Sequence, residues 1–189
     1  MPQKNTARFY SETNGLVKAI DFLLIKRGLF EYLINHSTEG GTTVAYGLIN
    51  MLSLFSLSRI HFELLYFSGF ALHMPQPTLM LLIKVYLINF AIFTTAILIH
   101  NRNSGKISLN LSRIIHAYAL AHCYGSFYLL FVIWEYTTLF YFFALDFLVS
   151  CSLLLAAEIL TGTKSLAYLL ILMMSLVKYA FLVRKYTRV

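Results

Sequence analysis

The sequence predicts an all-α fold: a polytopic transmembrane helical bundle of five spans, or four, preceded by an N-terminal amphipathic interfacial helix. The first observation behind this prediction is composition, because 59% of the 189 residues are hydrophobic and only 12% are charged. A soluble domain is about 45–50% apolar and about 25% charged, so this chain has too few charges to cover a surface that faces water. The second observation is a series of long apolar runs separated by short polar or Pro/Gly-containing breaks.

Residues 1–42 are predicted to be a cytoplasmic N-terminal segment that precedes the bundle at 43–189. The segment is polar at first and has no apolar stretch followed by a small-residue cleavage site, so it does not read as a signal peptide. Within it, residues 16–34 carry five ionisable side chains, and each Lys, Arg or Asp at the centre of a span costs about 2.5–3.5 kcal/mol. We therefore predict an amphipathic helix. Its apolar face meets either the lipid interface or the cytoplasmic end of the bundle.

Five apolar runs follow, at 43–72, 78–100, 112–134, 136–160 and 165–183. The breaks between them contain residues that disfavour helix, such as Gly40-Gly41 and the prolines of HMPQP at 73–77. A span needs about 20 apolar residues, which the last four runs match. The first run is longer, at about 45 Å as a straight helix, so part of it is expected to lie beyond the hydrocarbon core.

The distribution of Lys and Arg predicts an N-terminus in the cytoplasm. These residues occur before the first run and in every second break after it, and breaks rich in Lys and Arg lie on the cytoplasmic side of a membrane. The fifth run departs from the alternation, since it would place the basic tail of Arg184, Lys185 and Arg188 on the opposite side. Either that tail is a tolerated exception or one late run does not cross. We expect the endoplasmic reticulum of a eukaryote, in keeping with spans of modest length.

Three ionisable residues interrupt the first run: Arg59, His61 and Glu63 lie there among apolar residues. If residues 43–60 make the crossing, all three lie near its far boundary, where Arg59 can extend to the interface and pair with Glu63 at i+4. The alternative places them deeper, facing a polar cavity, as ionisable groups within a membrane often do.

Asp146 is the sharpest candidate for a functional residue, because it lies near the middle of the fourth run and its side chain is too short to reach the interface. It must carry a proton, face a wet cavity, or pair with a basic group such as Lys84 or Lys178. Each of these two lysines lies within six residues of an end of its run, so extension to the interface also explains them. A structural Asp that bonds neighbouring helices and an ion-coupling carboxylate both remain open.

A stripe of small residues at i, i+4 and i+8 predicts a close helix–helix seam: Ala117, Ala121 and Gly125. This seam either packs the bundle or receives a partner. No cofactor or metal is predicted, because His116 and His122 point about 120° apart on one helix and no metal-ligand spacing occurs. The basic residues form no stripe typical of nucleic-acid binding, and Cys123 and Cys151 are expected to be buried thiols.

These features favour a non-catalytic multi-pass protein that acts as a subunit, scaffold or assembly factor of a membrane complex, with the lipid bilayer and other membrane proteins as partners. The sequence contains no P-loop, GxSxG, HExxH or GxGxxG pattern, which favours a protein that is not an enzyme. The alternative is a small ion channel or transporter with Asp146 in the path. A second alternative is an integral membrane enzyme that modifies lipids.

Overall fold

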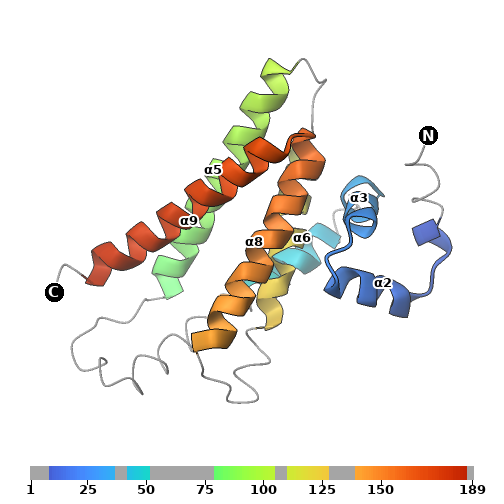
Figure 1. The fold of residues 1–189 in the computed structure, drawn as a ribbon, viewed down its shortest axis with the longest axis horizontal. Coiled ribbons are helices and arrows are strands. Elements are labelled where there is room, and N and C mark those ends of the chain that lie inside the picture. Colours follow the sequence, from blue (N-terminus) through green and yellow to red (C-terminus); the bar gives the residue numbers. More distant parts are fainter. Residues whose placement is uncertain (1–8, 37–41, 52–78, 105–109, 128–138, 187–189) are drawn as a thin grey trace.

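The computed structural model describes residues 9–36, 42–51, 79–104, 110–127 and 139–186, and every regular element in these ranges is a helix. Beyond a short turn at 9–12 and helical residues 42–51, the elements are α2 (Gly15–Leu23), α3 (Arg27–His36), α5 (Leu79–Asn103), α6 (Leu111–His122), the 3₁₀ turn η2 (Cys123–Ser126), α8 (Leu139–Thr161) and α9 (Lys164–Tyr186). Figure 1 shows α5, α6, α8 and α9 grouped together, with α2 and α3 beside them. The all-α prediction is confirmed for this part of the chain.

The N-terminal amphipathic stretch is two helices and not one. α2 ends at Leu23, and Ile25 has a φ of 50°, a left-handed conformation that is rare for a β-branched residue. Two backbone hydrogen bonds close this turn: the Ile25 N–H donates to the Phe22 carbonyl, and the Lys26 N–H donates to the Asp21 carbonyl. This turn separates α2 from α3, which begins at Arg27.

The third apolar run is not one continuous α-helix in the described residues. α6 begins after Asn110, whose side-chain oxygen accepts a hydrogen bond from the Ser112 N–H at 3.2 Å, a typical N-cap. It ends at His122, after 12 residues or about 18 Å, and the chain continues as the tighter η2 turn. The described α-helix is therefore shorter than a membrane span.

α8 and α9 form a helical hairpin with a very short connection. Gly162 has a φ of 74°, and its N–H donates to the Glu158 carbonyl at 2.7 Å. A glycine in this left-handed conformation is a common helix terminator because it has no Cβ to clash. The Thr161 hydroxyl also donates to the Ala157 carbonyl at 2.7 Å.

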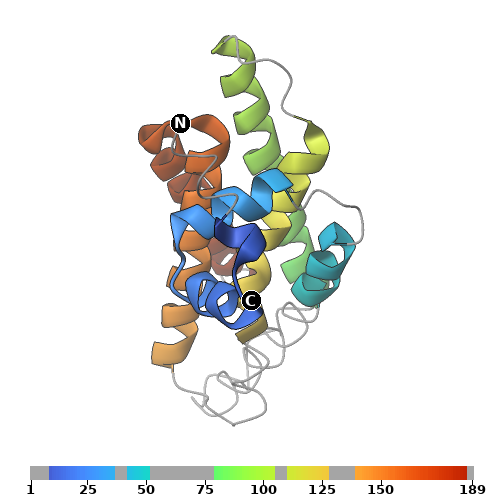
Figure 2. The same ribbon diagram turned by 90° about the vertical axis from the view of Figure 1, so that its right-hand side faces the viewer.

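One hydrophobic core joins α3, α5, α6, α8 and α9. Its fully buried members include Phe30, Ile34, Phe93, Ile97, Ile114, Ala117, Leu120, Ala121, Ala156, Ala157 and Ala167. Figure 2 shows α3 lying against the bundle, and the burial of Phe30 and Ile34 explains that position.

Two helical stretches of the described chain are long and apolar enough to cross a membrane: Leu82–Asn103 and Ala144–Thr161. They correspond to the second and fourth predicted runs. The first run lies mostly outside the described residues, as does the end of the third. These two stretches support membrane association, while a five-span arrangement stays a prediction.

Candidate functional site

An ion pair inside the bundle joins Asp146 of α8 to Lys178 of α9. The Lys178 ammonium donates to the Asp146 carboxylate, and the two side chains are only 21% (Asp146) and 20% (Lys178) exposed. Both residues lie at matching distances from the Gly162 turn, so the hairpin brings them to the same level. Of the two lysines that the sequence offered as partners, the structure pairs Lys178, whereas Lys84 is exposed on α5.

His122 of α6 lies within electrostatic range of both Asp146 and Lys178. Its Nδ1 is 3.0 Å from the Tyr118 carbonyl oxygen, which can only accept, so Nδ1 carries a proton and donates it. The imidazole packs between aromatic rings, with centroids 4.2 Å from Tyr118 and 5.0 Å from Tyr86. Three titratable groups from three helices therefore meet in one region of the bundle.

Asn50 links the helical residues 42–51 to this region, and sequence reasoning missed it. Its Nδ2 donates to the Ala119 carbonyl at 2.9 Å and to the Tyr86 hydroxyl at 3.3 Å, while the residue is almost fully buried. A single Asn in a long apolar run was the available signal, because such a group must find partners away from water.

The stripe of small residues lies in the interior of the bundle. Ala117 and Ala121 are fully buried members of the core, and Gly125 is buried in η2. The Ser152 hydroxyl of α8 donates to the Ala121 carbonyl at 2.6 Å. A contact between a side chain and a neighbouring helix backbone requires close approach, which small residues allow. In this structure the stripe faces α8.

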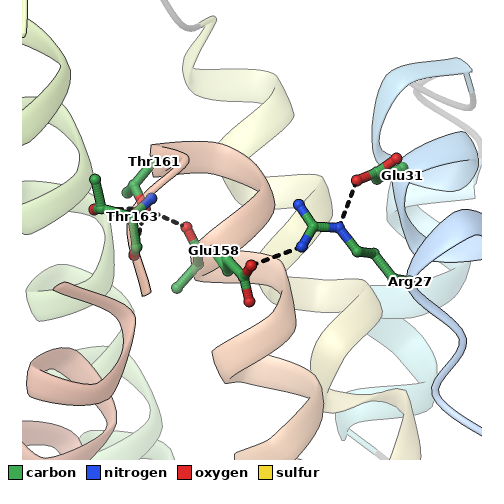
Figure 3. A network of polar contacts seen from close by, with 6 residues as sticks. Arg27, Glu31, Glu158, Thr161 and Thr163 are labelled. Carbon is green, nitrogen blue, oxygen red and sulfur yellow. Dashed lines mark hydrogen bonds and ion pairs between the residues drawn. The ribbon is translucent and has the colours of Figure 1, made fainter. Parts of the chain in front are cut away.

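A second polar cluster attaches α3 to the end of α8 (Figure 3). The Arg27 guanidinium donates to Glu158 at 2.6 Å through one nitrogen and to Glu31 at 2.8 Å through another. Glu158 is mostly buried. Sequence reasoning missed this role, because 131 positions separate Arg27 from Glu158.

A third cluster holds α2. The Asp21 carboxylate is 2.6 Å from the Lys26 ammonium and accepts a hydrogen bond from the Tyr10 hydroxyl at 2.9 Å. The hydrogen bond from Lys26, followed by that from Tyr10, holds the pKa of Asp21 below its ordinary value. Burial, followed by the contact with Asp21, raises the pKa of Tyr10 to about 12.

Arg59, His61 and Glu63 lie outside the described residues, so the interfacial and cavity interpretations of that trio stay predictions. Within the described ranges, no group of three or more His, Cys, Asp or Glu side chains is placed to hold a metal ion. The sequence matches no protein family model and no curated protein, and the fold matches no solved structure.

Proposed function

We propose that this chain is a multi-pass membrane protein that acts as a non-catalytic subunit, scaffold or assembly factor of a membrane complex. The observation that carries the proposal is that several polar groups within the apolar helices bond to a side chain or to the backbone of another element. The Asp146–Lys178 pair, the Asn50 bond to Ala119 and the Ser152 bond to Ala121 all join separate elements. Such contacts hold helices together in a membrane.

The surface offers a place for a partner on α9. Five of its apolar side chains point away from the bundle: Tyr168, Leu169, Leu172, Met173 and Leu176. The same helix buries Ala167, Leu170 and Met174 against the core. A helix with one face in the bundle and an apolar face outside it suits contact with lipid or with another membrane helix.

Two neighbouring methionines give a matched test of this face, because Met173 is 48% exposed and Met174 only 4%. A photo-crosslinking amino acid replaces each in turn in the full-length protein within its native membrane. A scaffold predicts one or a few discrete protein adducts from the Met173 position and only intramolecular products from the Met174 position. Lipid adducts alone from Met173, Leu169 and Leu176 would contradict a stable partner on α9.

The topology that we propose, with a cytoplasmic N-terminus at the endoplasmic reticulum, makes a separate prediction. Asn35 and Asn110 begin glycosylation sequons, which are modified only on the lumenal side. Both should remain unmodified. An extended loop with a sequon inserted at 134–137 should be glycosylated and serves as the positive control. Modification at Asn110, lost in Asn110→Gln, would reverse the orientation.

A second candidate, a small ion channel or transporter, is favoured by the meeting of Asp146, Lys178 and His122. A carboxylate and an imidazole that share a region can exchange protons. Purified protein in liposomes that dissipates a pH gradient, with the flux lost in Asp146→Asn and kept in Glu158→Gln, would favour this function over the scaffold.

A further inference from the structure

The α2–α3 pair lies along the side of the bundle. Its contacts show at which level of the candidate span of α8 each end of the pair lies. The Tyr124 hydroxyl of η2 donates to the Phe22 carbonyl, and the two rings stack with centroids 4.8 Å apart. One turn before Tyr124, Ala121 is bonded to Ser152, which lies at the middle of the candidate span Ala144–Thr161. Phe22 at the end of α2 is therefore level with the middle of that span.

The other end of the pair lies near the end of the span. Asn35 in the last turn of α3 accepts a hydrogen bond from Arg113 in the first turn of α6. Arg113 and Tyr124 are about 16 Å apart along a helix, roughly half of a hydrocarbon core of about 30 Å. The chain thus rises through about half of the core between Phe22 and Asn35. Figures 1 and 2 both show α2 beside the length of α8, not beyond its end.

Each of the five charged side chains in this segment has a partner in the structure. The sequence argued against insertion because residues 16–34 hold five ionisable groups. In the structure Asp21 pairs with Lys26, and Arg27 pairs with both Glu31 and Glu158. The fifth group, the Lys18 ammonium, lies 5.8 Å from the centre of the Tyr32 ring. Paired charges and a cation over an aromatic face are the forms in which charge is tolerated away from water.

The outward face of α2 is apolar. Leu16 is 68% exposed, Ile20 46% and Leu24 64%, and Val17 and Leu23 are also exposed. The inward side holds Asp21, which is buried, and Phe22, which packs on the core. The α5 and α9 helices on the other side of the bundle also expose apolar side chains (Figure 1).

We propose that α2 and α3 form a re-entrant helical pair that dips into the leaflet at the Glu158 end of α8, with lipid acyl chains covering the outward face of α2. The pair enters and leaves at one side and does not span. This inference rests on the proposal that the bundle is embedded in a membrane. It replaces the expectation that this segment lies flat in the headgroup layer.

Depth-dependent fluorescence quenching tests the proposal in the full-length protein. Trp134, the single tryptophan, is replaced by Phe, and one new tryptophan is introduced as Ile20→Trp, Leu24→Trp or, as the reference in the candidate span of α8, Phe147→Trp, at a position that is 69% exposed. Each protein is reconstituted in phosphatidylcholine vesicles with bromine either deep in the acyl chain or close to the headgroup.

Re-entry predicts that Ile20→Trp and Leu24→Trp are quenched more by deep than by shallow bromine, with blue-shifted emission, as Phe147→Trp is. Stronger quenching by shallow bromine at both α2 positions, with deep quenching retained at Phe147→Trp, would overturn re-entry and leave the membrane bundle intact. Quenching of the α2 positions by aqueous iodide alone would overturn it as well. If Phe147→Trp also responds only to iodide, the membrane proposal itself fails.

Discussion

Removing one partner of the Asp146–Lys178 pair should destabilise the bundle, because the other charge is left between α8 and α9. Both side chains are about four-fifths removed from solvent. Breaking a fully buried pair from one side costs about 3–5 kcal/mol, while polar contacts between membrane helices are worth about 0.6–2 kcal/mol. The partial exposure places this pair between those cases, so Asp146→Asn or Lys178→Gln should each cost about 1–3 kcal/mol.

The double variant separates the pair from other effects of each substitution. Asp146→Asn with Lys178→Gln removes both charges and keeps polar groups that can bond to each other. It should recover most of the loss, and the double-mutant cycle then reports the coupling free energy directly. The charge reversal Asp146→Lys with Lys178→Asp should recover part of it.

The buried thiol of Cys123 supplies the measurement. In a Cys151→Ser background, a thiol-reactive dye reports the exposure of Cys123 as protein in lipid nanodiscs is heated. A loss of 1–3 kcal/mol corresponds to a fall in Tm of roughly 2–12 °C for a chain of this size. Lys84→Met, which removes an exposed lysine, is the control and should leave Tm nearly unchanged.

Identical Tm values for wild type, both single variants and the double variant would refute the reasoning. A different result bears on function: an Asp146→Asn protein that keeps its Tm and its assembly but loses its cellular phenotype would replace the scaffold by an ion-coupling role.

Three further predictions concern other contacts. Glu158→Gln should weaken the attachment of α3 to α8 by under about 1 kcal/mol, because Arg27 is half exposed. Hydrogen exchange in α3 should become faster while exchange in α5 stays unchanged, and equal exchange of α3 in the wild type and the variant would contradict this. Ala121→Leu should cost about 1–3 kcal/mol of stability by overpacking the contact with α8, whereas Ala91→Leu at an exposed position of α5 should cost little. The Tm of each variant in nanodiscs is the measurement, and equal falls in Tm would argue against the seam. Ile25→Gly should lower Tm, because the loss of a side chain that packs against the core outweighs the relief of a left-handed β-branched residue, and a raised Tm would show that the backbone conformation dominates.

The sequence alone determined the class of structure. An excess of apolar residues over charges leaves no way to cover a water-facing surface, and long uninterrupted apolar runs satisfy their backbone only as helices. The same reasoning singled out Asp146, because a lone carboxylate in such a run needs a partner or a proton. It also singled out the Ala117–Ala121–Gly125 stripe from spacing along one helix. These inferences depend on local composition and period, which a single chain displays directly.

The tertiary structure decided the pairings. Lys84 and Lys178 were equivalent candidates until the Gly162 turn placed Lys178 level with Asp146. Arg27 and Glu158 are far apart in sequence, and only the packing of α3 on α8 brings them together. The N-terminal charges argued against insertion when each was counted as isolated, but they are paired in the fold. The energy of a charge depends on its neighbours in space, and one sequence without its fold does not contain them.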